Sequence, residues 1–362
     1  MRKYCLLFVL LSLLTISCKK DPSIKTTVKE VDFLNNTQDK VLEGILVDSI
    51  LGSSNIVIFD TLMMVQTSDP EGQIKVYSTR TLNLLGSFCK KGRARNEMNR
   101  LIVSTEQAYY KDGHVILVAV DVPNIFKEID ITASLNSGST VVISTQECMS
   151  LNDGEFMILG NDYNTRYEFY RNVYENQTRN GENKRVPSRY YLYKEGKRKE
   201  LKFFSSVMKS EVRTSFLYIG NLYKHPSKNI VVQSFERLDY LLFMDFDSTK
   251  KFAVHNNGSL TFNDVFVRPT ISRPDDLLHF TDGASSSDYL MFLYWQGDYT
   301  RKQNKDRSNP EILVFDWDGN YITGFKLGNY VRSIEYDELH KKLYGLDADE
   351  RLFAFDLNNI LP

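Results

Sequence analysis

The fold is decided by a stretch near the C-terminus, Ile312-Leu313-Val314-Phe315-Asp316-Trp317-Asp318-Gly319-Asn320 followed by Ile322-Thr323-Gly324-Phe325. Two runs of β-branched, aliphatic and aromatic residues flank a polar segment that contains Asp318-Gly319. An Asp-Gly pair between two such runs is the strongest short-range signal for a β-hairpin. The stretch therefore predicts two antiparallel strands joined by a tight turn.

Runs of the same kind recur along most of the chain and are separated by turn residues. They cover residues 56–59, 62–66, 74–77, 114–120, 156–159, 230–235, 240–246, 289–294 and 352–355. Alternation of apolar and polar residues over four to eight positions is typical of β-strands. No amphipathic helical pattern longer than about ten residues is present after the first residues of the chain. The sequence predicts an all-β protein.

The strands group into a strand-turn-strand unit that occurs six times. The units can be aligned on six residues, one in each: Tyr77, Ile129, Tyr193, Met244, Phe315 and Phe355. The gaps between successive alignment residues are 52, 64, 51, 71 and 40 residues. A four-stranded propeller blade takes about 40–50 residues, so these gaps fit blades that carry insertions in some loops.

Such units predict a six-bladed β-propeller over residues 27–362. A single twisted sheet leaves both faces apolar and is stable only between two similar sheets, and a closed ring satisfies every sheet. The last unit ends close to the C-terminus, while residues 27–33 alternate like a strand. We therefore expect this N-terminal strand to complete the last blade. A pair of face-to-face sheets is the structural alternative.

The first 17 residues have the pattern of a signal peptide. Arg2 and Lys3 precede an apolar run from Leu6 to Ile16, and a small residue, Ser17, follows it. A permanent membrane-spanning helix needs about 20 apolar residues, so this run is too short for one. We expect residues 1–17 to be removed during export.

Leu14-Thr15-Ile16-Ser17-Cys18 resembles the lipobox of bacterial lipoproteins. The resemblance implies cleavage before Cys18 and lipidation of that residue, with residues 18–26 forming a lipidated tether. Two or three acyl chains hold a protein durably on a membrane. An ordinary secretory peptide with an incidental cysteine is the alternative. We expect an outer-membrane lipoprotein, and the short polar segment that begins at Lys19 leaves both the periplasmic and the cell-surface side open.

Charge and cysteine content narrow the possible partners. Loss of Arg2 and Lys3 with the signal peptide leaves 43 basic and 46 acidic residues, a formal charge of about −3. A nucleic-acid-binding domain is normally basic, so we expect no nucleic-acid partner. The remaining cysteines, Cys89 and Cys148, could form a disulfide in an oxidising compartment or be two separate buried side chains.

Three groups of short motifs carry a family resemblance. They are Leu85-Gly86-Ser87-Phe88 with Lys90-Lys91-Gly92 and Asn96-Glu97-Met98, then Val314 to Gly319 with Phe325-Lys326-Leu327, and Ile334 to Glu338 with Lys342 to Leu346. On these residues the mature chain resembles the TolB-like six-bladed propeller family of Bacteroidetes lipoproteins. That family usually has a loop richer in glycine and proline where this chain has Arg93-Ala94-Arg95-Asn96. Its members are largely uncharacterised, so the resemblance implies a fold and an envelope location but no activity.

Two arginine-containing segments are candidates for ligand binding. Arg93 and Arg95 stand in the segment expected to join the first two blades. Arg268 and Arg273 flank a proline-containing segment that precedes a strand expected near the central channel. Arginine can bind a carboxylate or phosphate through two parallel hydrogen bonds. For both segments, the alternative is a solvated loop or connector.

The sequence carries no recognisable catalytic signature. The five histidines have no metal-ligand spacing, and no nucleophile elbow or phosphate-binding loop is present. The turn Asp316 to Asn320 resembles a calcium loop, but the Asp-Gly pair favours a hairpin turn. We expect no metal and no cofactor.

These observations predict a non-catalytic binding or scaffold module for an envelope protein or a small ligand. The alternative is a glycan-active hydrolase or lyase with its site in the channel, because a propeller can host either role.

Overall fold

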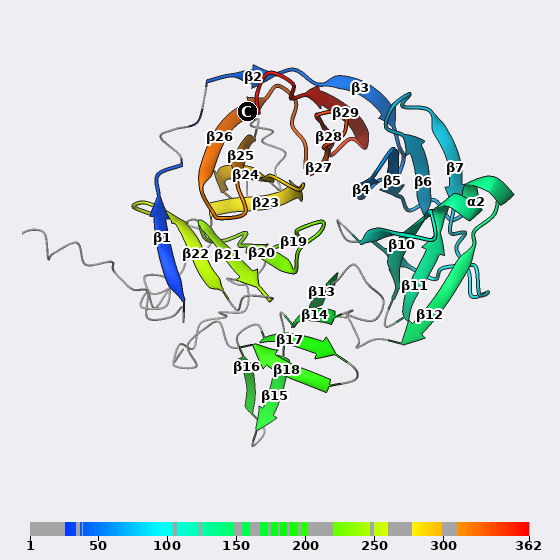
Figure 1. Cartoon of the computed structure of the whole chain (residues 1–362), viewed down its shortest axis with the longest axis horizontal. Coiled ribbons are helices and arrows are strands. Elements are labelled where there is room, and N and C mark those ends of the chain that lie inside the picture. The colour runs from blue at the N-terminus through cyan, green and yellow to red at the C-terminus, as the bar shows by residue number, and fades with distance from the viewer. Residues whose placement is uncertain are drawn as a thin grey trace, which may run out of the picture.

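The computed structural model of the chain describes residues 26–33, 37, 39–103, 107–122, 125–147, 154–159, 167–172, 175–179, 182–186, 189–194, 197–201, 220–246, 250–259, 277–298 and 310–361. Within these residues the strands form six sheets of four or five strands and one two-stranded sheet. The larger sheets lie around a common centre (Figure 1). The chain is therefore an all-β propeller, as its alternating sequence pattern predicts.

We number the six larger sheets by chain order. The first contains β4 (Asn55–Phe59), β5 (Leu62–Gln66), β6 (Ile74–Ser78) and β7 (Leu84–Phe88). The second contains β8 (Leu101–Ile102), β9 (Ala108–Lys111), β10 (His114–Asp121), β11 (Ile125–Asp130) and β12 (Val142–Glu147), with the short helix α2 (Ile131–Ser137) before β12. The third contains β13 (Gly154–Leu159), β14 (Tyr167–Asn172), β17 (Arg189–Lys194) and β18 (Lys197–Leu201). Strands β15 (Glu175–Arg179) and β16 (Glu182–Val186) form the two-stranded sheet.

The remaining three sheets also include strands from the N-terminal segment. The fourth contains β19 (Leu222–Lys224), β20 (Ile230–Ser234), β21 (Tyr240–Asp245), β22 (Lys251–Asn256) and β1 (Thr27–Val31). The fifth contains β23 (Leu277–Ser285), β24 (Leu290–Asp298), β25 (Glu311–Phe315), β26 (Tyr321–Leu327) and β2 (Val41–Leu42). The sixth contains β27 (Ser333–Asp337), β28 (Lys342–Leu346), β29 (Arg351–Asp356) and β3 (Ile45–Ser49).

The repeat recognised in the sequence corresponds to these sheets. The six alignment residues lie on β6, β11, β17, β21, β25 and β29. If β8 and β9 are counted as one interrupted strand, each of these is the third strand of a different sheet. The repeat is visible in the sequence because this strand has sheet neighbours on both sides and packs between blades, so its apolar pattern is strong.

The N-terminal segment does not close the ring in the predicted way. The prediction that residues 27–33 complete the last sheet is wrong, because β1 pairs in parallel with β22 of the fourth sheet. Strand β2 then pairs in parallel with β26, and β3 pairs antiparallel with β29. The segment thus follows the outer edges of three successive sheets, as the blue chain in Figure 1 shows. The fourth strand of the last sheet is β3.

The hydrophobic core is divided among the spaces between neighbouring sheets. Four clusters of buried side chains are found in the described residues, and each joins two adjacent sheets. Each cluster contains side chains of both sheets: Val57 and Leu117 in one, Phe243 and Phe292 in the next, Val314 and Phe355 in the third, and Met63 and Tyr344 in the fourth. Burial of these faces requires the neighbouring sheet, which explains why the chain forms a ring of sheets.

The turn quoted first is a hairpin turn, as predicted. It joins β25 to β26, and the carboxylate of Asp316 accepts hydrogen bonds from the backbone N–H groups of Asp318 (2.9 Å) and Asn320 (2.8 Å). Gly319 has a φ of +73°, a conformation that a side chain disfavours. The carboxylate of Asp316 therefore stabilises the turn.

Candidate functional site

A cavity of about 600 Å³ lies where the first strands of five sheets end. Ligand pockets in proteins are typically about 300–1,000 Å³, so the cavity could hold a small ligand or a side chain of a partner. It is lined by Ile58, Phe59, Asp60, Gln107, Ala108, Tyr109, Tyr110, Val118, Lys224, Pro226, Ser285, Ser286, Glu335, Tyr336, Asp337, Glu338 and Leu339.

The ring topology brings these residues together. Strands β4, β19, β23 and β27 are edge strands of their sheets and face the centre in Figure 1, and β9 pairs with β10 on the same side of that strand as β8. Each contributes residues from its C-terminal end or from the turn that follows, such as Asp60 after β4 and Glu338 after β27. Because the equivalent strands of a propeller run in the same direction, their ends meet at one end of the channel.

The cavity has an exposed rim and a buried floor. Tyr110 and Leu339 are 53% and 63% exposed, whereas Lys224 and Glu335 are 7% and 2% exposed. Asp60 and Glu338 are also exposed. A ligand approaching from solvent would therefore meet the exposed carboxylates and aromatic ring before it reached the buried groups.

The rim is held in place between the first two sheets. The hydroxyl of Tyr110 donates a hydrogen bond of 2.7 Å to the carboxylate of Asp60. This hydrogen bond raises the pKa of Tyr110. The rings of Phe59 and Tyr110 are 5.0 Å apart between centroids and inclined by 64°, a favourable edge-to-face arrangement. One ring of the rim is thus oriented by both polar and aromatic contacts.

A second part of the rim joins the fifth and sixth sheets. The carboxylate of Glu338 accepts hydrogen bonds from the backbone N–H (3.2 Å) and the hydroxyl of Ser287. Asp337 Oδ2 lies 2.7 Å from Nδ1 of His340. Burial, followed by the negative charge of Glu338, raises the pKa of Tyr336 to about 12. The cavity wall is therefore ordered and has a negative electrostatic environment here.

His225 lies directly after Lys224, and in its neutral form it stabilises the turn that follows β19. Its Nδ1 accepts hydrogen bonds from the backbone N–H groups of Ser227 (3.1 Å) and Lys228 (3.2 Å), and its ring lies 4.8 Å from that of Trp317. Burial, together with the charges of Lys228 and Lys224, lowers the pKa of His225 to about 4. A protonated Nδ1 could not accept either hydrogen bond.

We expect His225 to make the folded state less stable in acid. Its pKa is about 4 in the folded state and about 6.5 in the unfolded state, so the unfolded state binds the proton more tightly. The neutral ring contributes about 2–3 kcal/mol to the free energy of unfolding. This contribution is complete above pH 6.5 and is lost as the pH falls toward 4. Urea unfolding at several pH values should show a shallower pH dependence for His225→Gln than for the wild type. Equal slopes for the two proteins would contradict this role.

The predicted site residues Arg93 and Arg95 lie away from the cavity. Both are exposed on the segment between β7 and β8, which joins the first two sheets as predicted. This segment enters β8 at Leu101, which pairs with Asp121 at the end of β10. Tyr110 of the cavity pairs with Val115 near the start of β10. The arginines and the cavity are therefore at opposite ends of an eight-residue strand.

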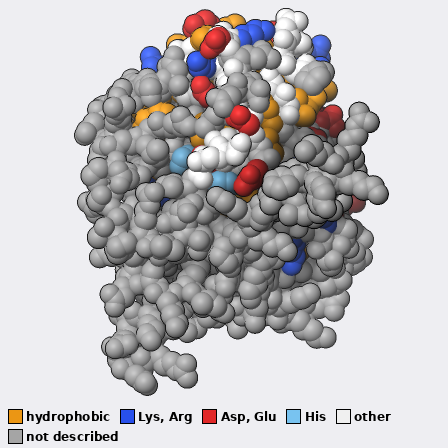
Figure 2. Space-filling view, turned by 90° about the vertical axis from the view of Figure 1, so that its left-hand side faces the viewer, with side chains coloured by type: hydrophobic (Ala, Val, Ile, Leu, Met, Phe, Trp, Pro, Cys, Tyr) orange, Lys and Arg blue, Asp and Glu red, His pale blue; other side chains and the backbone are white. Residues whose placement is uncertain are grey.

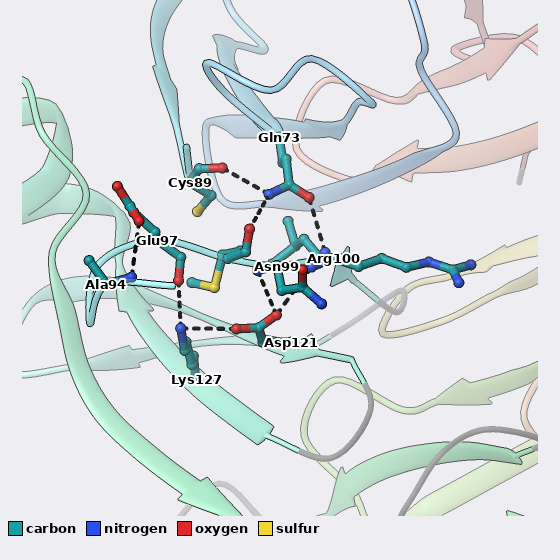
Figure 3. A network of polar contacts seen from close by, with 10 residues as sticks. Gln73, Cys89, Ala94, Glu97, Asn99, Arg100, Asp121 and Lys127 are labelled. Atoms are coloured by element: carbon teal, nitrogen blue, oxygen red, sulfur yellow. Dashed lines mark hydrogen bonds and ion pairs between the residues drawn. The ribbon is translucent and has the colours of Figure 1, made fainter. Parts of the chain in front are cut away.

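A buried polar network holds the arginine loop, residues 90–100 (Figure 3). Nζ of Lys127 lies 3.1 Å from Asp121 Oδ2 and donates a hydrogen bond of 2.6 Å to the carbonyl of Glu97. Asp121 Oδ1 accepts hydrogen bonds from the backbone N–H groups of Asn99 (2.8 Å) and Arg100 (3.2 Å). The amide of Gln73 donates to the carbonyl of Met98 (2.9 Å). These side chains thus anchor the backbone of the loop, while Arg93 and Arg95 are exposed to solvent.

The other predicted site residues are outside the described residues. They are Cys18, Arg268 and Arg273, and Cys148 is also outside the described residues. The strand expected after the proline-containing segment is β23. Cys89 is a buried free thiol, and burial raises its pKa to about 12.

The described residues offer few other sites. They contain no group of three or more His, Cys, Asp or Glu side chains arranged to hold a metal ion. None of their helices is long and apolar enough to cross a membrane. On the face shown in Figure 2, side chains of both charges are interspersed with hydrophobic ones in the described part. The cavity is therefore the strongest candidate site in the described part of the chain.

The cavity residues are not among the site residues predicted from the sequence. Dense charge and proline content mark Arg93 and Arg268 instead. The available signal was positional: Asp60 and Glu338 both stand just after the first strand of a sheet. In a propeller, side chains at equivalent positions of different units meet at the axis.

Several solved structures match the chain at very low sequence identity. A Bacteroides fragilis protein described as an exported protein is 9% identical, with a TM-score of 0.52, and the match covers 91% of this chain and 98% of that chain. The β-propeller domain of Cps50 (Swd1) from Myceliophteria thermophila is also 9% identical, with a TM-score of 0.42 and coverage of 86% and 99%. The WD40 domain of Neurospora crassa Pan2 is 10% identical, with a TM-score of 0.40 and coverage of 90% and 99%.

No curated protein matches the chain. The family model described as TolB-like 6-blade propeller-like matches residues 54–339, which span all six sheets from β4 to β27. The chain therefore belongs to the TolB-like 6-blade propeller-like family.

Proposed function

We propose that this protein is a lipid-anchored, six-bladed envelope propeller that acts as a non-catalytic binding module. The observation that carries the proposal is the cavity of about 600 Å³ at one end of the channel, with residues from five sheets. Its rim carries exposed Tyr110 and Leu339, and aromatic residues are enriched at the centres of binding interfaces. The hydrogen bonds that orient Asp60 and Glu338 reduce the ordering required on binding.

The proposed anchor is Cys18, in the outer membrane. Strand β1 begins at Thr27, so nine residues separate its start from the proposed lipid. An extended chain of that length spans at most about 30 Å. The outer edge of the fourth sheet would therefore stay close to the membrane. Protease treatment of intact cells tests which side of the outer membrane the protein faces, because a surface lipoprotein would be digested and a periplasmic one would be protected.

Substitution at the rim tests the binding function. Leu339→Arg places a long charged side chain at the cavity mouth, whereas Leu84→Arg makes the same change at an exposed position on β7. We expect cross-linking in envelope extracts to give a partner or ligand adduct with the wild type and with Leu84→Arg. The amount of adduct should fall at least about tenfold with Leu339→Arg. A tenfold change corresponds to about 1.4 kcal/mol of binding free energy. Equal adducts from both variants would place binding outside the cavity.

A glycan-active hydrolase or lyase is the second candidate. The observation in its favour is that four carboxylates of the described residues line the cavity: Asp60, Glu335, Asp337 and Glu338. Glycoside hydrolysis uses two carboxylates about 5–10 Å apart. A glycan whose hydrolysis is lost in Glu335→Gln while its binding persists would establish this function instead.

A further inference from the structure

The charges around the cavity are unequal. Four carboxylates line it, those of Asp60, Glu335, Asp337 and Glu338, whereas Lys224 is the one lysine or arginine among the described lining residues. Four negative side chains and one positive side chain give the described lining a formal charge of about −3. A concave site concentrates the electric field of its charged groups. A ligand of opposite charge would be attracted to this end of the channel.

The position of each carboxylate shows which ones a ligand could contact. Asp337 is buried against His340, 2.7 Å away, and Glu335 is 2% exposed on the floor. Asp60 and Glu338 are exposed at the rim and come from the first and sixth sheets, which are neighbours. Each accepts a hydrogen bond from a neutral hydroxyl, of Tyr110 and Ser287 respectively. An ionised carboxylate has about four acceptor sites, so both retain capacity for a ligand.

Aromatic rings lie beside these two carboxylates. Phe59, Tyr109, Tyr110 and Tyr336 line the same cavity. Tyr110 donates its hydroxyl to Asp60, so its ring is fixed next to a negative charge. The face of an aromatic ring attracts a cation within about 6 Å of its centre. Carboxylates and rings together therefore match a cationic group carried on an apolar stem.

We propose that the cavity binds an ammonium or guanidinium group on a flexible stem, as in a lysine or arginine side chain or a free alkyl amine. This inference rests on the proposed binding function and specifies its ligand class. The rim carboxylates of Asp60 and Glu338 accept hydrogen bonds from the cation, and the stem packs against Tyr110 and Leu339. Charge-assisted hydrogen bonds of this kind are about twice as strong as neutral ones.

Ligands of other charge fit the site less well. A phosphate or an acidic glycan would meet the carboxylates of Asp60 and Glu338 before it reached Lys224 on the floor. A neutral sugar could stack on the rings but would gain nothing from the excess negative charge. The dependence of affinity on salt separates these cases, because salt screens interactions of exposed charges.

Calorimetric titration of the full chain in detergent tests the ligand class. The probes are a capped Gly-Lys-Gly peptide, the same peptide with an acetylated lysine, the diamine cadaverine and a neutral glucan oligosaccharide. We expect the lysine peptide or cadaverine to bind, with an affinity that falls as salt is raised, and the acetylated peptide to bind at least about tenfold more weakly. Tighter binding of the peptide than of cadaverine identifies a protein side chain as the source, and the reverse identifies a free amine.

Variants locate the binding in the cavity. Glu338→Gln and Asp60→Asn should each weaken binding of the cationic probe about ten- to hundredfold, the range of a hydrogen bond to a charged group. The matched control is Glu147→Gln, which removes an exposed carboxylate on β12, outside the cavity. Both rim carboxylates are exposed, so we expect thermal unfolding of all three variants to match the wild type.

Three outcomes would overturn the inference. They are equal binding of the acetylated and free lysine peptides, cation binding that Glu338→Gln leaves unchanged, and salt-independent binding of the oligosaccharide in place of the amines. If the Leu339→Arg test succeeds and the cationic probes do not bind, the binding function stands and the ligand class is wrong. If both fail, the cavity is not the binding site.

Discussion

Replacing Phe33 with alanine should lower the free energy of unfolding by about 3–5 kcal/mol. Phe33 is fully buried, although it lies two residues after β1 in the N-terminal segment. Its ring lies 5.6 Å from that of Phe315 and 5.9 Å from that of Tyr294, both in edge-to-face geometry. Removal of this ring leaves a cavity between the fourth and fifth sheets and releases the N-terminal segment from their outer edges.

Urea unfolding followed by tryptophan fluorescence measures this loss. Val41→Ala is the matched control, because Val41 is in the same segment and is 49% exposed. Exposed substitutions of this kind usually change stability by no more than about 0.5 kcal/mol. A loss below about 1 kcal/mol for Phe33→Ala would mean that the N-terminal segment contributes little to the stability of the ring.

Replacing Lys127 with methionine should have a similarly large effect, about 3–5 kcal/mol. Lys127 and Asp121 are both buried, and their charged atoms are 3.1 Å apart. Methionine retains most of the side-chain volume but leaves the carboxylate of Asp121 buried without its opposite charge. The carbonyl of Glu97 also loses the hydrogen bond from Nζ. We therefore expect both lower stability and a looser arginine loop.

Lys90→Met is the matched control for this prediction. Lys90 pairs with Glu71 at 2.8 Å, but both side chains are exposed. Exposed ion pairs contribute only about 0–1 kcal/mol, so chemical denaturation should separate the two variants clearly. Limited digestion with trypsin should cleave after Arg93 or Arg95 faster in Lys127→Met than in the wild type. Similar losses of stability in Lys127→Met and Lys90→Met would contradict the prediction. They would show that the buried pair of Lys127 and Asp121 matters no more to stability than an exposed pair.

The arrangement of strands could be read from the sequence because its signals are local. Apolar alternation and the Asp318-Gly319 turn predict β25 and β26, and the same reasoning placed Tyr77 and Phe355 on equivalent strands of different sheets. These patterns depend only on residues that are close in the chain. They determined the fold class and the repeat.

The tertiary structure decided which edge each N-terminal strand joins. Every outer strand offers a similar row of backbone N–H and C=O groups, so the alternation of residues 27–33 is compatible with several sheets. The choice of β22 is made by long-range packing, in which Phe33 enters the space between the fourth and fifth sheets.

The candidate site was also decided by tertiary structure. Asp60 and Glu338 are 278 positions apart in the chain and line one cavity because ring closure makes the first and sixth sheets neighbours. Arg93 and Arg95 have a strong local charge signal, yet the direction of β10 places them at the end opposite Tyr110. A local pattern specifies the strand on which a residue lies, but only the direction and closure of all the sheets determine which ends of those strands meet.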